Sequence, residues 1–138
     1  MNAIEVVQRY IKAWNGRDAD ALVALFAEGG TYRGPRVDHD LTGQAIGNYA
    51  KTVWATFPDV TLELISVSQT GPGQVAYQWL LRGTNSGPLI LIDGSAATGR
   101  TVTVLGNDVM QVEGEKIRSV EVNYNRQAVD DQLRGTAP

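Results

Sequence analysis

A segment near the C-terminus contains side chains that could carry out chemistry. Residues 117–125 alternate in polarity, and one row of the segment contains Glu121, Asn123 and Asn125. The opposite row is mainly apolar. A polar row of this kind either faces solvent or lines a cavity that holds a polar ligand. The surrounding sequence favours the cavity.

Two carboxylates are candidates for a general base. Glu121 would be a usable base if burial raised its pKa, although a solvent-facing glutamate is favoured because unpaired buried Glu is rare. Asp108 shares its alternation with Val104 and Val112, so we expect it to point inward. A carboxylate among apolar side chains is costly unless it is paired or functional. The alternative is a paired, structural Asp beside a bulge at Gly106.

Other polar residues allow two interpretations each. Asn125 either hydrogen-bonds a substrate carbonyl or enolate, or is a strand-end amide that holds the following turn. His39 lies between Asp38 and Asp40 and either covers a pocket mouth or is a solvated loop residue, which we favour. These three adjacent side chains do not converge on one point, so we predict no metal site.

Aromatic residues are spread along the chain and could form the walls of a binding site. Tyr32, Tyr49, Trp54 and Trp79 are predicted to contact a planar ligand, with ordinary core packing as the alternative. Asn123 is expected to contribute a polar contact from the C-terminal segment.

Composition excludes several classes of protein. The 138 residues predict a single domain spanning 1–138, with net charge −3 and therefore no basic surface for nucleic acid. There is no Cys and one His, so neither a disulfide framework nor a thiolate metal site is possible. No signal peptide and no membrane-spanning run are recognisable, and a cytoplasmic protein is expected.

Helices are expected first and strands later. Asn2 and Asp18 resemble N-caps of helices that end near 15 and 29, and a third helix should end at Pro58. Alternating segments then predict strands at 60–68, 74–82, 100–112 and 116–125, with a loop over 83–99. A short strand at 31–34 and a final helical turn at 127–133 complete the prediction.

This order predicts an α+β fold. A curved antiparallel sheet would wrap around about three N-terminal helices and form a cone with an internal, mostly apolar pocket. Because the 74–82 strand has apolar residues on both faces, we expect a homodimer through the sheet.

Short motifs in this order and spacing resemble the SnoaL-like polyketide cyclases, whose cone-shaped fold is shared with ketosteroid isomerase, scytalone dehydratase and nuclear transport factor 2. The matching stretches are residues 10–18 (YIKAWNGRD), 41–44 (LTGQ), 57–59 (FPD), 82–88 (RGTNSGP), 97–100 (ATGR), 106–109 (GNDV), 114–117 (GEKI) and 131–135 (DQLRG).

The resemblance implies ring closure by intramolecular aldol condensation, with no cofactor and no metal. It also implies an acid/base Asp where this chain has Asn125, and a His where it has Asn85, which we predict to contact substrate. An amide is hardly basic, so both changes remove titratable groups.

We therefore predict a cofactor-free protein that acts on a hydrophobic, oxygenated, cyclic or polyketide-like small molecule. The expected reaction is proton transfer alpha to a carbonyl, as in cyclisation or isomerisation. Asp108 or Glu121 would act as the base, and Asn125 would donate a hydrogen bond to the oxyanion. A cofactor-independent hydroxylase and a non-catalytic binding protein are the alternatives.

Overall fold

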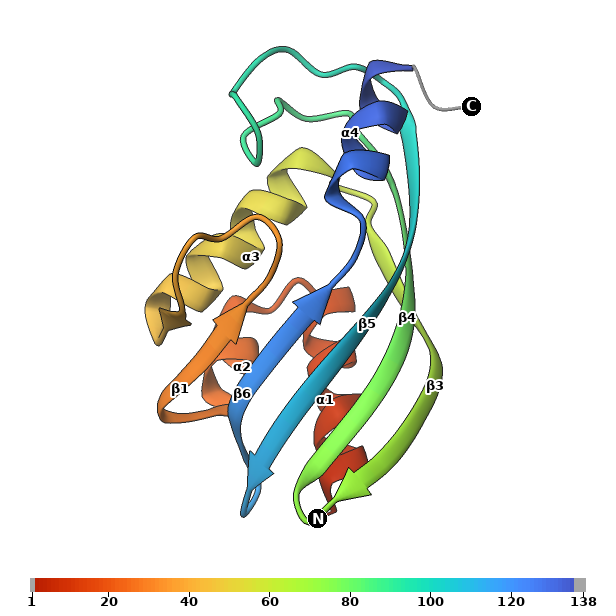
Figure 1. Cartoon of the computed structure of the whole chain (residues 1–138). Helices are drawn as coiled ribbons and strands as arrows, with labels where there is room; N and C mark the ends of the chain where they lie inside the picture. Colours follow the sequence, from red (N-terminus) through yellow and green to blue (C-terminus); the bar gives the residue numbers. More distant parts are fainter. Residues whose placement is uncertain (1, 136–138) are drawn as a thin grey trace.

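The computed structural model describes residues 2–135, in which four helices accompany one six-stranded curved sheet (Figure 1). The helices are α1 (Ala3–Asn15), α2 (Ala19–Ala24), α3 (Gln44–Thr56) and α4 (Arg126–Arg134). The strands are β1 (Phe26–Arg33), β2 (Leu41–Thr42), β3 (Thr61–Gly71), β4 (Gln74–Thr84), β5 (Thr101–Glu113) and β6 (Lys116–Asn123).

The predicted helix caps at Asn2 and Asp18 are confirmed. The Asn2 side chain accepts a hydrogen bond from the Glu5 amide at 2.9 Å, and Asp18 accepts one from the Ala21 amide at 3.0 Å. Each cap satisfies a backbone donor that has no partner within its own helix. The caps fix where α1 and α2 begin, and α1 carries one wall of the site described below.

The structure differs from the prediction where α2 gives way to β1. The helix was expected to include Phe26, but β1 begins at this residue and pairs in parallel with β6, with Phe26 opposite Ile117. The Ile117 amide also donates to the Leu25 carbonyl at 2.8 Å. The partner strand lies some 90 residues later in the chain, so no local pattern encodes this pairing. The pairing overrides the helical spacing of the apolar residues before Gly29.

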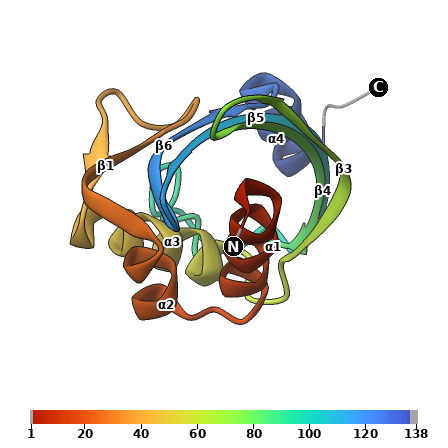
Figure 2. The same ribbon diagram turned by 90° about the horizontal axis from the view of Figure 1, so that it is seen from below.

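The sheet has the strand order β2-β1-β6-β5-β4-β3. Every pair is antiparallel except β1 with β6, so the predicted antiparallel sheet is corrected at this one pair. Seen along its length, the sheet curves around α1, and α3 lies beside α1 on the concave side (Figure 2). The structure therefore has the predicted α+β cone.

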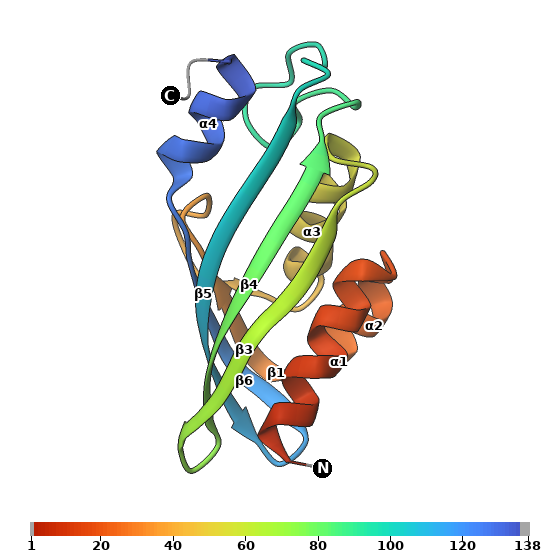
Figure 3. The same ribbon diagram turned by 90° about the vertical axis from the view of Figure 1, so that its right-hand side faces the viewer.

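The strands present alternate faces to the interior and to solvent. On β5, Val102, Val104, Gly106, Asp108 and Met110 are buried, whereas the residues between them are mostly exposed. Figure 3 shows α1 and α2 on one side of the curved sheet and α4 at the far end, near the ends of β4 and β5. The concave face and these helices enclose the core.

Candidate functional site

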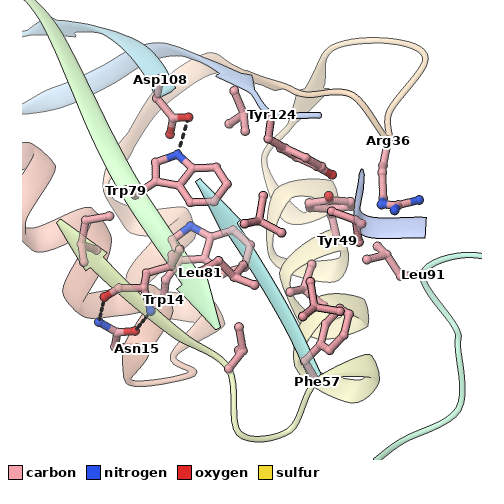
Figure 4. A pocket seen from close by; sticks show the side chains of 18 of the residues that line it. Trp14, Asn15, Arg36, Tyr49, Phe57, Trp79, Leu81, Leu91, Asp108 and Tyr124 are labelled. Carbon is pink, nitrogen blue, oxygen red and sulfur yellow. Dashed lines mark hydrogen bonds between the residues drawn. The ribbon is translucent and has the colours of Figure 1, made fainter. Parts of the chain in front are cut away.

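A cavity of about 80 Å³ lies between α1, α3 and the concave face of the sheet (Figure 4). Its walls are aliphatic and aromatic side chains from α1, α3, α4 and strands β1 and β3–β6, joined by Leu91 of the long loop. Its charged residues are Asp108 from β5 and Arg36 from the β1–β2 connection. An apolar cavity with a few polar groups is the usual form of a small-molecule site.

Asp108 is the carboxylate of this cavity, and only 3% of the residue is exposed. The indole Nε1 of Trp79 donates a hydrogen bond of 2.8 Å to its Oδ1 (Figure 4). Burial raises the pKa of Asp108 to about 7, while the hydrogen bond from Trp79 and the nearby Tyr77 hydroxyl lower the pKa by a smaller amount. The group can therefore accept or release a proton near neutral pH.

Two tyrosines, Tyr77 and Tyr10, lie close enough to Asp108 for its charge to act on their hydroxyl groups. Tyr77 is opposite Asp108 in the β4–β5 pair, and its buried hydroxyl completes no hydrogen bond of standard geometry among residues 2–135. Tyr10 comes from α1 and lines the cavity. Burial and the negative charge of Asp108 raise the pKa of both hydroxyl groups well above the ordinary value, so both stay protonated hydrogen-bond donors.

Trp79 reaches Asp108 because Gly106, its partner in the β4–β5 register, has no side chain. A Cβ atom at Gly106 would overlap the indole ring. The glycine therefore leaves space for the ring, which extends along β5 to the carboxylate two residues away.

Arg36 lines the cavity away from Asp108, and 3% of its side chain is exposed (Figure 4). Its Nη2 forms an ion pair of 2.6 Å with Asp130 of α4. Tyr49 and Tyr124 lie next to the guanidinium, whose charge lowers their pKa values, although burial is the larger effect and raises both. This part of the cavity is thus a cluster of hydrogen-bond donors.

The predicted aromatic residues take different positions. Tyr32, Tyr49 and Trp79 line the cavity, and the rings of Tyr32 and Tyr49 lie 5.4 Å apart. Trp54 instead packs edge to face on Trp14, with ring centroids 5.6 Å apart. Trp54 is not among the residues that line the cavity, and its contact with a ligand stays a prediction.

The polar row of the C-terminal segment faces away from the cavity, which differs from the prediction. Glu121 and Asn123 are exposed on β6, and Val120 and Val122 between them are buried. Asn125 lies outside the strand and caps α4, accepting a hydrogen bond of 3.0 Å from the Ala128 amide. The apolar row fills the concave side, because only that row can be buried without loss of hydration.

Asn85 is buried but is used by the structure of the long loop. Its amide nitrogen donates to the carbonyls of Thr56 and Gly87, each at 2.9 Å, and its oxygen accepts from the Thr98 amide and hydroxyl. All of these partners are protein groups, so Asn85 joins the two ends of the loop to α3 and does not line the cavity. His39 is exposed, beside Asp38.

Sequence reasoning missed Arg36 and Tyr10 as residues that line the cavity. The Gly34 carbonyl accepts from the Val37 amide at 3.2 Å, which makes a turn with Pro35 in its second position and Arg36 in its third. A Pro-centred turn was a usable signal for a fixed side chain. Nothing in the local sequence indicated that this side chain points inward.

Within residues 2–135, no three His, Cys, Asp or Glu side chains gather closely enough to hold a metal ion. The helices in the same part of the chain are too short or too polar to cross a membrane.

Comparison with known proteins identifies the family. The sequence pattern of the SnoaL-like domain matches residues 7–120, so the chain belongs to the SnoaL-like family. No curated protein matches the chain. The family binds small-molecule ligands, in agreement with the cavity.

Solved structures share the fold at low sequence identity. IdmH of Streptomyces antibioticus, a proposed polyketide cyclase, is 22% identical with a TM-score of 0.81, over 97% of this chain and 99% of IdmH. AclR of Streptomyces galilaeus, a proposed hydroxylase, is 18% identical with a TM-score of 0.81, over 99% of this chain and 86% of AclR. A protein of Catenulispora acidiphila with a ketosteroid isomerase-like fold is 23% identical with a TM-score of 0.79, over 97% of this chain and 94% of that protein. The chain therefore has the ketosteroid isomerase-like cone fold.

Proposed function

We propose that this protein is a cofactor-free enzyme that transfers a proton alpha to a carbonyl group of an apolar, oxygenated, cyclic or polyketide-like substrate. The observation that carries the proposal is Asp108, a carboxylate buried in an apolar cavity with its pKa raised to about 7. A base with a pKa near the working pH combines a large deprotonated fraction with high basicity.

The proposed step uses two groups of the protein, Asp108 and Tyr10. The Asp108 carboxylate takes the proton from the alpha carbon, and the electron pair of the C–H bond moves to the carbonyl oxygen. The Tyr10 hydroxyl donates a hydrogen bond to the resulting enolate. In an aldol closure the enolate carbon then bonds to a second carbonyl carbon, whose oxygen takes the proton from Asp108. In an isomerisation a conjugated enolate takes the proton back from Asp108 at another carbon.

The polar residues of β6 have no part in this step. Glu121 and Asn123 are exposed on the other face of the strand, and Asn125 caps a helix. Asp108 therefore supplies the carboxylate that the resemblance led us to expect at position 125, from a different strand.

The test is hydrogen–deuterium exchange at the alpha carbon of 1-tetralone, a bicyclic apolar ketone, followed by proton NMR in D₂O. We expect wild-type protein to accelerate the exchange and Asp108→Asn to lose about 10²–10⁴-fold of that acceleration. Glu121→Gln is the matched control and should exchange like wild type. No acceleration by wild type, or equal rates in Asp108→Asn, would contradict the proposal and favour a binding protein or a hydroxylase.

We also propose a homodimer through the convex face of the sheet. Leu105 is 55% exposed and Ile65 is 46% exposed, and Leu80, the partner of Leu105 in the β4–β5 pair, lies on the same face. Exposed apolar side chains in one area are typical of an interface. Light scattering at micromolar concentration should give twice the monomer mass, and Leu105→Glu should return the mass to 14.9 kDa. A wild-type monomer would refute it.

A further inference from the structure

Arg36 is a buried cation that the proposed proton transfer does not use. Its side chain is 3% exposed and lines the same cavity as Asp108. Placing a guanidinium group among apolar side chains is costly unless the group is paired or binds something. One partner is present in Asp130, whose side chain is 15% exposed.

The protein builds this position from two separate segments. The turn at Gly34–Val37 presents Arg36, and a Cβ atom at Gly34 would lie 3.3 Å from Cβ of Val122, so the turn packs closely on β6. Asp130 comes from α4, whose first turn is capped by Asn125. Both charged residues thus come from ordered backbone segments, and their ion pair joins the turn to α4.

Asp130 neutralises Arg36 but leaves donors for a ligand. The pair makes one close contact, between Nη2 and Oδ1, and a guanidinium group has five N–H donors. The hydroxyls of Tyr49 and Tyr124 lie next to the guanidinium. The Tyr124 hydroxyl interacts with both Tyr49 and Arg36. All three residues line the cavity, so the N–H donors of Arg36 that Asp130 and Tyr124 do not use can meet a molecule inside it.

Arg36 lies apart from Asp108 in the cavity. In the view of the pocket, Trp79 lies beside Asp108, and Tyr124 lies between Asp108 and Arg36 (Figure 4); the rings of Trp79 and Tyr124 have centroids 6.0 Å apart. The cavity thus has a proton acceptor in one part and a cationic donor group in another, joined by apolar walls.

We propose that Arg36, together with Tyr49 and Tyr124, binds a carboxylate group of the substrate. The planar fork of an Arg side chain matches the two oxygens of a carboxylate, and such charge-assisted hydrogen bonds are stronger than neutral ones. The substrate class is then an apolar ring system or chain with a carboxylate at one end and the reacting carbonyl at the other. This inference rests on the proposed function for the position of the reacting carbon, but carboxylate binding itself does not require catalysis.

The alternative role for Arg36 is purely structural, with the ion pair only joining the turn to α4. The two roles predict different results. A structural ion pair stabilises the fold and does not discriminate between ligands, whereas a carboxylate site prefers an ionised ligand to a neutral ligand of the same shape.

The test compares benzoate with benzamide at pH 6, titrated into uniformly ¹⁵N-labelled protein and followed by NMR on the indole N–H signals and the Arg36 Nε–H signal. We expect wild-type protein to bind benzoate at least 10-fold more tightly than benzamide, and benzoate alone to shift the Arg36 signal. Arg36→Gln should reduce the preference to about one, and Arg36→Lys should retain a smaller preference because Lys has no planar fork.

Arg33→Gln is the matched control, since Arg33 lies in the same segment but is exposed, with 53% of its side chain accessible. This variant should keep the wild-type preference. Equal binding of benzoate and benzamide by wild type overturns the proposal, and this result does not depend on whether Arg36→Gln folds. A preference for benzoate that survives in a folded Arg36→Gln variant also overturns it.

Asp108→Asn separates this inference from the proposed function. That variant should lose exchange on 1-tetralone while it keeps the preference for benzoate. If wild type shows no exchange but does prefer benzoate, the proposed reaction fails and the carboxylate site stands.

Discussion

The indole of Trp79 on β4 donates its N–H to the carboxylate of Asp108 on β5 over 2.8 Å, diagonally across the strand pair. The hydrogen bond lowers the pKa of Asp108, whereas burial raises it by more, and the balance is a pKa of about 7. A neutral donor in this position stabilises the ionised form without adding a charge to the cavity.

Trp79→Phe should therefore raise the pKa of Asp108 further. A hydrogen bond to a charged group contributes about 1.5–3 kcal/mol, which corresponds to about one to two pKa units. The measurement is the pH dependence of 1-tetralone exchange, whose midpoint should move to higher pH. An unchanged midpoint in a folded variant would show that the indole does not control the carboxylate.

Exchange catalysed by the wild type should rise with pH through about 7 and then level off. The base must be deprotonated to accept a proton, and the deprotonated fraction of Asp108 increases as the pH passes its pKa. Rates measured between pH 5 and 9, corrected for the buffer reaction, test this. A rate that is already level from pH 5 upward would assign the reaction to an exposed carboxylate.

The stability of the protein should change with pH in the opposite direction. The pKa of Asp108 is raised on folding from 3.8 to about 7, so between these values the folded state binds more protons than the unfolded state. The contribution of this group to the free energy of unfolding then falls by at most about 1.4 kcal/mol per pH unit as the pH rises through that range. Urea unfolding of wild type and Asp108→Asn should show this slope in wild type and lose it in the variant.

Gly106→Ala should disturb the site without adding a charge or a polar group. The new methyl group overlaps the Trp79 ring, which must move away from Asp108, and overpacking of this kind typically costs about 1–3 kcal/mol. Urea unfolding should detect that loss, and exchange activity should decrease with it. Asn107→Ala, exposed on the same strand, is the control and should behave like wild type.

Asn125 should respond to substitution as a helix cap. Asn125→Ala removes the acceptor for the Ala128 amide and should cost about 1 kcal/mol of unfolding free energy. Asp is as good a cap as Asn, so Asn125→Asp should keep the stability. It should also leave exchange on 1-tetralone unchanged, because the side chain lies outside the cavity; increased exchange would restore the catalytic role first predicted for this position.

Local sequence determined most elements of the fold. Caps such as Asn2 and Asp18 act through hydrogen bonds to backbone groups three residues away, and alternation decides which strand face can be buried. The inward direction of Asp108 follows from the alternation of β5 in the same way. These features depend on neighbours within a few residues, and the order of the short motifs pointed to the family.

Tertiary structure decided what local patterns leave open. Alternation separates the two rows of β6 but does not say which one faces a cavity. Asn123 was therefore predicted to contact a ligand although it is exposed, whereas Glu121 has the solvent-facing position that was favoured for it. The parallel pairing of Phe26 with Ile117 and the contact of Arg36 with Asp130 join segments about 90 residues apart. Burial that raises the pKa of Asp108 comes from side chains of several elements packed together, and no single segment of the sequence contains them.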